Sequence, residues 1–184
     1  MELTTDRLVL RYLSEADIDD ITRICQDPEI YQNTLYIPSP YTRADAKNWL
    51  DQIFKSRAED KAGDDFGIHL KADDRFIGVI SLGAKNRHDD SEVGYWLDKD
   101  YREQGIMTET LREIIAFGFA KGCHRISACH FAGNPKSGRV MEKAGMTREG
   151  LHRESLKKNG QYLDDVVYGI LERDCQSVKG EPTA

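Results

Sequence analysis

Apolar residues recur with two different periods along the chain, and the period separates predicted strands from predicted helices. A two-residue alternation of apolar and polar positions predicts strands over residues 8–12 and 66–70, and short apolar-rich runs predict further strands over residues 76–82, 92–97 and 125–131. Apolar residues three and four positions apart predict helices over residues 14–25, 42–54 and 108–121, and the helix-start signal Asn134-Pro135 predicts a fourth over residues 134–144. Two further strands are expected on either side of Asn159-Gly160, a dipeptide typical of tight hairpin turns.

These elements follow one another in the order β-α-α-β-β-β-α-β-α-β-β. Hairpins mix with a single β-α-β unit, so the pattern predicts the mixed α/β class, a sheet flanked by helices, rather than a doubly wound parallel sheet. No repeat or linker divides the chain. We expect one domain over residues 1–174 and a frayed tail over residues 175–184.

Composition narrows the functional classes. The 184 residues are 39% hydrophobic and 32% charged, which suits a packed domain. No apolar run approaches the ~20 residues that span a bilayer, and no secretory signal is visible, so we expect a cytoplasmic protein without a membrane partner. The net charge of −6 argues against a nucleic-acid partner. Four scattered cysteines indicate reduced thiols, and no motif supports a metal.

The segment 101–108 lies between a predicted strand and the N-terminus of a predicted helix. Unpaired N–H groups and the positive end of the helix dipole can hold a pyrophosphate there, and Gly105 lets the backbone approach a ligand. An ordinary loop leading into a helix explains the same pattern, so spacing alone leaves both interpretations open.

Five segments together favour the ligand site: residues 5–11 (TDRLVLR), 92–97 (EVGYWL), 102–107 (REQGIM), 134–146 (NPKSGRVMEKAGM) and 159–169 (NGQYLDDVVYG). In this order they resemble the GNAT superfamily of acetyl-CoA-dependent N-acetyltransferases, and within it the RimJ/RimL-like branch that acetylates protein N-termini. The resemblance implies a mostly antiparallel, splayed central sheet. It also implies acetyl-CoA as co-substrate and direct transfer to a primary amine, with a protein or peptide N-terminus as the favoured acceptor.

The resemblance also assigns the coenzyme contacts. It places the pyrophosphate on Arg102, Glu103, Gln104, Gly105, Ile106, Met107 and Thr108. It places pantetheine in the splay beside Trp96 and Leu97, with the Asn134 side chain bonded to it; a plain helix N-cap is the alternative for Asn134. Glu103 and Met107 depart from the family pattern, which often has glycine at the first position and glycine or alanine at the second. Both would disturb the coenzyme if they pointed toward it.

Two residues are predicted to act on the reacting atoms. By resemblance, the Ser137 hydroxyl lies near the coenzyme sulfur and protonates or hydrogen-bonds the departing thiolate. Glu92 begins the central strand and is the first candidate for the base that takes a proton from the amine; its apolar neighbours are expected to desolvate it. Glu149 is the second candidate base, water alone is the third, and His130 is a possible assistant.

Two other functions remain open at this point. One is acetylation of a small-molecule amine such as a polyamine, amino acid or aminoglycoside. The other is a non-catalytic acyl-CoA-binding module, for which Glu103 and Met107 are the main argument. Residues 31–41 are predicted to form a mobile wall of the acceptor cleft, and the sequence does not distinguish a monomer from a homodimer.

Overall fold

The computed structural model describes residues 1–59 and 63–178 of the chain. Its strands are β1 (Glu2–Thr4), β2 (Leu8–Tyr12), β3 (Asp64–Leu70), β4 (Phe76–Leu82), β5 (Asp90–Leu97), β6 (Arg125–Phe131), β7 (Thr147–Lys158) and β8 (Gln161–Leu171). Its α-helices are α1 (Ile18–Cys25), α2 (Pro28–Asn33), α3 (Arg43–Ala58), α4 (Ile106–Ala120), α5 (Pro135–Lys143) and α6 (Glu172–Val178). Short 3₁₀ turns cover Glu15–Asp17 and Lys99–Tyr101.

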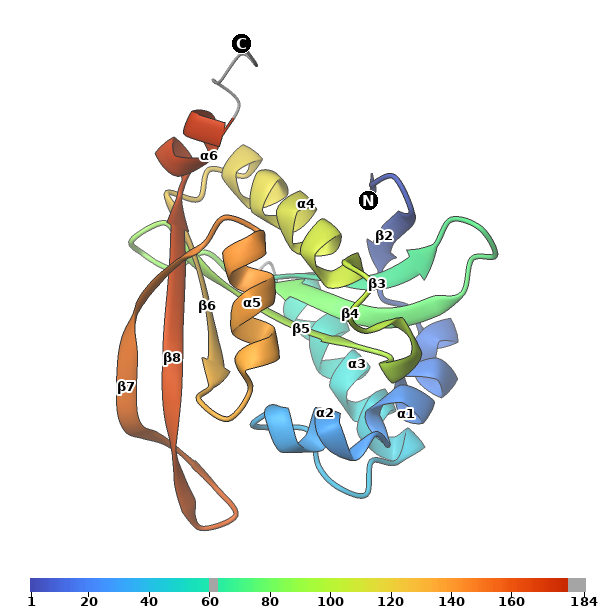
Figure 1. Cartoon of the computed structure of the whole chain (residues 1–184). Helices are drawn as coiled ribbons and strands as arrows, with labels where there is room; N and C mark the ends of the chain where they lie inside the picture. The colour runs from blue at the N-terminus through green and yellow to red at the C-terminus, as the bar shows by residue number, and fades with distance from the viewer. Residues whose placement is uncertain (60–62, 179–184) are drawn as a thin grey trace.

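The strands form a single sheet in the order β1-β2-β3-β4-β5-β6-β8-β7 (Figure 1). Among the described strands, β5 and β6 pair in parallel, and all other neighbours pair antiparallel. The crossover between β5 and β6 is α4, as a parallel connection requires. The prediction of a mixed α/β, mostly antiparallel sheet is therefore confirmed.

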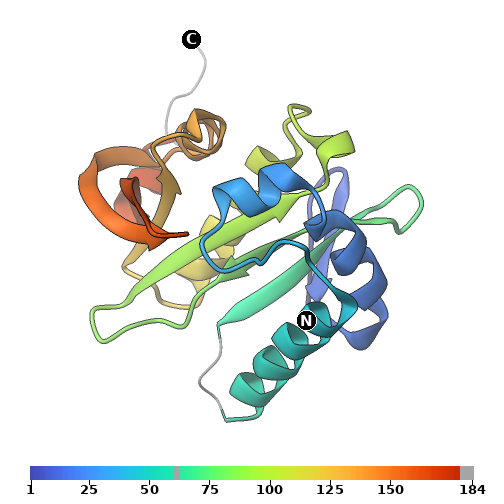
Figure 2. The ribbon, with the colours of Figure 1, turned by 90° about the horizontal axis from the view of Figure 1, so that it is seen from below.

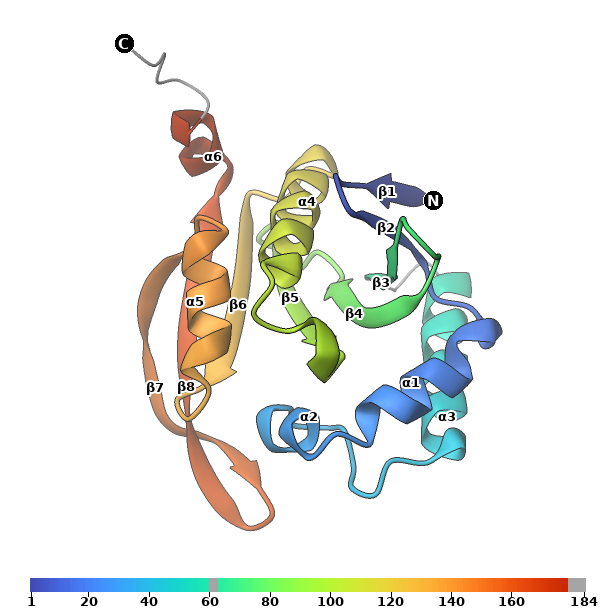
Figure 3. The same cartoon turned by 45° about the vertical axis from the view of Figure 1, so that its right-hand side comes forward.

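Helices cover both faces of the sheet and define two cores. On one face, α4 and α5 pack against the sheet around Leu111, Ile114 and Met141 (Figure 1). On the other face, α1 and α3 enclose a second cluster that includes Ile21 and Leu50 (Figure 3). The apolar stripes predicted for these helices are the faces that are buried, because burial of a stripe is what stabilises a short helix.

The parallel pair β5–β6 separates halfway along its length. Pairing runs from Asp90 opposite Arg125 to Val93 opposite Ala128 and then ends. Beyond that point β5 stays with β4 while β6 stays with β8, and Figure 1 shows the two strands diverging. We call the opening between residues 94–97 and residues 129–131 the fork. The splay implied by the family resemblance is thus present.

Four elements differ from the sequence prediction, and the first is the short strand β1, which was not predicted. The short helix α2 was not predicted; it begins at Pro28 because the Asp27 side chain accepts a hydrogen bond from the Glu29 N–H at 2.9 Å. The central helix starts two residues earlier than predicted, directly after Gly105. At the C-terminus an unpredicted helix, α6, covers Glu172–Val178; residues 179–184 of the predicted tail lie outside the described residues.

Candidate active site

The loop before α4 has the backbone shape of an anion cradle. Gly105 adopts φ = 77° and Glu103 adopts φ = 62°, so the chain turns twice through the left-handed region. The first hydrogen bond of α4 runs from the Glu109 N–H to the Gly105 carbonyl at 3.0 Å. The N–H groups of residues 106–108 therefore have no acceptor in the preceding turn of the helix, and the dipole adds a partial positive charge.

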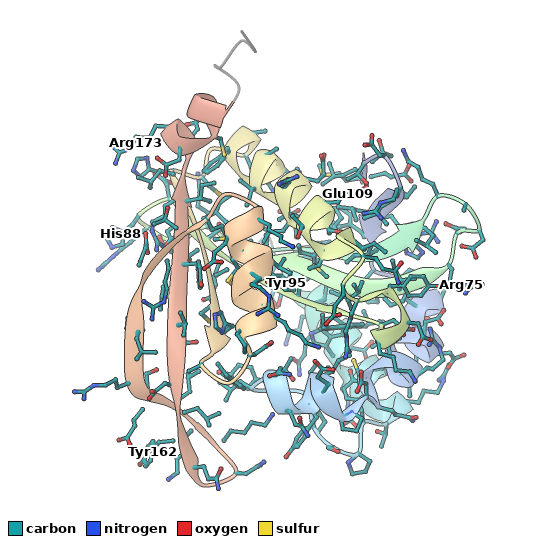
Figure 4. The ribbon with its side chains drawn as sticks, in the orientation of Figure 1. Arg75, His88, Tyr95, Glu109, Tyr162 and Arg173 are labelled. Carbon is teal, nitrogen blue, oxygen red and sulfur yellow. The ribbon has the colours of Figure 1, made fainter. Side chains whose placement is uncertain are left out.

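Arg7 fixes this loop from a distant part of the sequence. Its guanidinium donates to the Gln104 carbonyl at 3.1 Å and to the Glu109 carboxylate at 2.7 Å. Thr5 donates to the same carboxylate at 2.5 Å (Figure 4 labels Glu109). Although partial burial alone would raise it, these hydrogen bonds hold the pKa of Glu109 below its ordinary value. The sequence showed Thr5 and Arg7 only as a matching segment; their role follows from contacts about 100 positions away.

The Arg102 side chain makes structural contacts, while a coenzyme contact of this residue stays a prediction. Its side chain donates to Asp27 at 2.6 Å and to Glu29 at 2.7 Å, which ties the loop to α2. It also donates twice to the Leu97 carbonyl, at 2.9 and 3.1 Å. The Leu97 carbonyl was expected to accept a hydrogen bond from pantetheine. It already accepts two hydrogen bonds from Arg102.

The two departures from the family pattern do not crowd the loop. Met107 points into the core beneath the sheet and is 6% exposed. Glu103 is exposed and its carboxylate lies 3.0 Å from the ammonium of Lys136 on α5. Neither side chain occupies the turn where backbone N–H groups converge, which weakens the main argument for a non-catalytic module.

Strand geometry shows which backbone groups face the fork. The Glu92 carbonyl bonds to Gly83 and the Asp98 N–H bonds to Ile77, so even-numbered residues of β5 direct their backbone groups toward β4. Trp96 is one of them, and its ring packs near Phe76, 6.3 Å away between centroids. By the same alternation, the backbone N–H and C=O of Tyr95 and Leu97 point into the fork and those of Trp96 do not; contact of these residues with the coenzyme stays a prediction.

Tyr95 also connects the two sides of the fork through its side chain. Its hydroxyl lies 2.9 Å from the Ser137 hydroxyl and 3.2 Å from the Ser137 carbonyl on α5; Figure 4 labels Tyr95. Burial raises the pKa of Tyr95 to about 12, so the phenol stays protonated and can donate. Ser137 therefore lies next to a β5 tyrosine that sequence reasoning had treated as core packing, while its place beside the coenzyme sulfur stays a prediction.

Asn134 is free for a ligand. It stands at the N-cap position of α5 but makes no side-chain capping bond, so the helix-cap alternative does not describe it here. It lines a cavity of about 600 Å³ between α2 and the start of α5. Figure 2 shows α2 lying across this end of the sheet.

A second cavity of about 770 Å³ lies on the outer side of the loop. Its lining includes Gly105 and Thr108, the basic residues Arg7, Arg112 and Lys143, and the carboxylates of Asp6, Glu109 and Glu113. The N–H groups at the start of α4 and the three cations suit phosphate groups, while the three carboxylates reduce the positive charge that such a ligand would meet.

Glu92 faces the side of the sheet opposite Tyr95, because side chains alternate along a strand. Its carboxylate accepts a hydrogen bond from the Cys129 thiol at 3.3 Å, directly where the fork opens. The side chain is exposed, so the expected desolvation is absent. The reason is the same alternation: Val93 and Tyr95, which were expected to cover it, point to the other face.

The alternative bases are engaged elsewhere. Glu149 forms an ion pair with Arg125, which also bonds to Asp90 at 2.8 Å. His130 is buried beside Tyr168 under α5, and its Nδ1 lies 2.8 Å from the Phe131 carbonyl. Of the candidates, Glu92 is the carboxylate that lies at the fork without a cationic partner among the described residues.

The proposed acceptor wall is partly anchored. Lys158, near the tip of the β7–β8 hairpin, bonds to the carbonyls of Tyr31 and Thr34. Asn159 donates to the Tyr31 hydroxyl at 2.6 Å. The hairpin tip therefore closes against the end of α2, while Tyr36 further along the wall is 89% exposed.

Within residues 1–59 and 63–178, no cluster of three or more His, Cys, Asp or Glu side chains could hold a metal ion. No helix in the same part of the chain is both long and apolar enough to cross a membrane. The four cysteines are free thiols. The groups that the site does offer are backbone N–H and C=O groups, an unbonded amide and basic side chains, which fit the amides and phosphates of a coenzyme A ester.

Comparison with known proteins supports the same interpretation. Residues 7–147 match the family model described as an acetyltransferase (GNAT) domain. The protein named "Probable N-acetyltransferase YjcK" of Bacillus subtilis is 38% identical over 124 residues, covering 66% of this chain and 68% of its own. The L-amino acid N-acetyltransferase AaaT of Escherichia coli is 25% identical, covering 85% and 93%. The ribosomal protein uS5-alanine N-acetyltransferase of the same organism is 23% identical, covering 95% and 92%.

The fold agrees with these matches. A crystal structure of the ribosomal L7/L12 α-N-protein acetyltransferase RimL in complex with coenzyme A superposes with a TM-score of 0.84, covering 93% of this chain and 98% of that one at 19% identity. The family model spans most of the chain, and several relatives of similar length are N-acetyltransferases. The chain therefore belongs to the GNAT family of N-acetyltransferases.

Proposed function

We propose that this protein transfers the acetyl group of acetyl-CoA to the N-terminal amine of a protein or peptide, by direct attack in a ternary complex. The observation that carries the proposal is the fork itself. Its β5 edge presents the unpaired backbone groups of Tyr95, and the hydroxyl pair of Tyr95 and Ser137 lies 2.9 Å apart on its far side. An amide-rich thioester arm lying in the fork replaces the missing strand pairing and brings the thioester to Ser137.

The reaction needs two proton transfers, and the fork separates the groups that perform them. The amine enters on the Glu92 side and loses its proton to Glu92, directly or through a water, so that its lone pair can attack the acetyl carbonyl. The new C–N bond forms as the C–S bond breaks. The departing thiolate takes a proton or a hydrogen bond from Ser137, whose hydroxyl is held by Tyr95.

Two relatives favour different acceptors. The uS5-alanine enzyme acts on a ribosomal protein, and the RimL structure is that of a protein N-terminal acetyltransferase. The AaaT relative acts on L-amino acids, which makes a small amine the second candidate. We favour a protein N-terminus because Tyr36, in the proposed acceptor wall of residues 31–41, is exposed. That side of the cleft is therefore open to an extended peptide chain.

An acceptor screen tests the proposal. Coenzyme A release is followed with short peptides bearing free or blocked N-termini, with free amino acids and with polyamines. We expect acetylation at the α-amine of unblocked peptides, verified by mass. Turnover confined to amino acids or polyamines would select the second candidate, and tight acetyl-CoA binding with no turnover on any amine would indicate a binding module.

A further inference from the structure

One oxygen of a buried carboxylate, that of Asp165 on β8, lacks a hydrogen-bond partner among the described residues on the acceptor side of the fork. Asp165 is 8% exposed, and its Oδ1 atom makes no hydrogen bond to any described residue. A buried polar atom without a partner costs free energy, so such an atom calls for a structural or functional reason. Burial raises the pKa of Asp165 above its ordinary value.

Asp165 belongs to the same face of the sheet as Glu92 and Cys129. It stands opposite Phe131 on β6, two positions beyond the pair formed by Cys129 and Val167, so the register directs all of these side chains to one face. The Cys129 thiol lies 3.3 Å from the Glu92 carboxylate and also interacts with Asp165. The three polar groups therefore meet beside the point where the fork opens.

This cluster has too few donors. Two carboxylates share one thiol, which carries a single, weak S–H donor. Burial, together with Glu92, raises the pKa of Cys129, so the thiol keeps its proton and adds no positive charge. A cation with several N–H groups would supply what is missing.

We propose that Asp165, with Cys129 and Glu92, forms a subsite for a second cationic group on the acceptor, beyond the reacting amine. This rests on the proposed acetyl transfer. Asp165 lies one strand past β6, the wall of the fork, and neighbouring strands are about 4.8 Å apart. A nitrogen roughly 5–10 Å beyond the reacting amine matches the side chain of a lysine or arginine near a peptide N-terminus, or the next nitrogen of a polyamine.

The other titratable groups around Asp165 are histidines. His152 stands opposite it on β7, and His130 follows Cys129 on β6. Both lower the pKa of Asp165 when charged, but burial has the larger effect. The alternative is that Asp165 serves only as an ion-pair partner of His152 and does not contact the acceptor. An experiment has to distinguish these two roles.

The test measures kcat/KM for three acceptors with the wild type and with Asp165→Asn. The acceptors are a peptide that begins Ala-Lys, a peptide that begins Ala-Gln, and spermidine. We expect the wild type to prefer the Ala-Lys peptide by at least about tenfold in kcat/KM, as a charge-assisted contact allows, and Asp165→Asn to abolish that preference. The preference is the ratio of the kcat/KM values for the two peptides, so a change in turnover that is common to both peptides does not count as its loss. Asp51→Asn on α3, where Asp51 pairs with Lys47 at 2.9 Å, removes the same charge far from the fork and should keep the preference.

Binding is measured separately by calorimetry in the presence of coenzyme A. If no acceptor is acetylated but the Ala-Lys peptide still binds the wild type more tightly than Asp165→Asn, the proposed function fails and the subsite stands. If both peptides are acetylated equally by both proteins, the subsite is wrong and the function stands. If Asp165→Asn lowers kcat/KM for spermidine but not for either peptide, the subsite stands and the acceptor is a small polyamine.

Two further results would overturn the subsite. His152→Gln would reproduce the effect of Asp165→Asn if the carboxylate served only that histidine. A fall of several degrees in the Tm of the free Asp165→Asn protein would mark Asp165 as a structural residue. We expect an unchanged or higher Tm, because the amide removes the cost of an unpaired buried charge.

Discussion

The hydroxyl groups of Tyr95 and Ser137 lie 2.9 Å apart although they belong to different layers of the fold. Tyr95 comes from β5, the strand on one side of the fork, and Ser137 comes from the first turn of α5. The contact fixes the rotamer of a serine that would otherwise turn freely. It also supplies a proton donor next to the group that is expected to meet the departing thiolate.

Tyr95→Phe should therefore lower kcat by roughly ten- to a hundredfold, because Ser137 loses its positioning partner while the ring still packs. Affinity for acetyl-CoA should stay within about twofold, since the backbone contacts of residue 95 remain. Tyr12→Phe is a suitable control, because it also removes a buried hydroxyl contact, to Asp64 at 2.6 Å, but far from the fork. Equal kcat values for Tyr95→Phe and wild type would show that Ser137 needs no partner.

Replacing Gly105 by valine should weaken acetyl-CoA binding at least about tenfold. A β-branched residue resists φ = 77°, so the loop would have to change shape and misdirect its N–H groups. Gly122 at the other end of α4 adopts φ = 82° and provides the matched control, Gly122→Val. Calorimetry with both variants separates lost binding from general strain; equal affinities would remove the pyrophosphate from this loop.

Glu92→Gln should reduce kcat/KM most near neutral pH and recover toward wild type as alkaline solution deprotonates the amine. Glu149→Gln should have little effect on the rate, because its carboxylate is already paired with Arg125. A pH–rate comparison of the two variants decides the assignment. The opposite result would transfer the base to Glu149, and two fully active variants would leave water as the proton acceptor.

The contact between Arg7 and Glu109 should appear as a pH-dependent stability. The pKa of Glu109 is lower in the folded protein than its ordinary value of 4.5, so its stabilisation is fully present above pH 4.5 and is lost as pH falls through the lowered folded pKa. The Tm difference between wild type and Glu109→Gln should shrink below pH 4.5. Glu113→Gln on the same helix is the control, and a difference that does not depend on pH would contradict the assignment.

The periodic parts of the fold were predictable because a helix or strand that buries one face has apolar residues at regular intervals in the sequence. The strands around residues 8–12 and 92–97 were found this way, and the hairpin at Asn159-Gly160 was found from its turn dipeptide. The helix α2 was missed because its six residues make too short a stripe, and its start depends on the Asp27 cap.

Site residues were predictable only where a family motif marks them. The structure shows Ser137 beside Tyr95 and Gly105 directly before α4, and the catalytic and binding roles of both residues remain predictions. Trp96 was preferred to Tyr95 because the pairing with β4 decides which residues of β5 direct their backbone N–H and C=O toward the fork. The sequence does not show that pairing. Arg102 looked like a ligand contact because its carboxylate partners lie more than 70 positions earlier in the chain.

The central claim is that acetyl transfer takes place in the fork with Ser137 beside the departing sulfur. The most direct measurement pairs the turnover of Ser137→Ala on an acetylated acceptor peptide with its calorimetric affinity for acetyl-CoA. The account predicts a kcat that is roughly ten- to ten-thousandfold lower, with coenzyme affinity almost unchanged. Wild-type turnover by Ser137→Ala would contradict it.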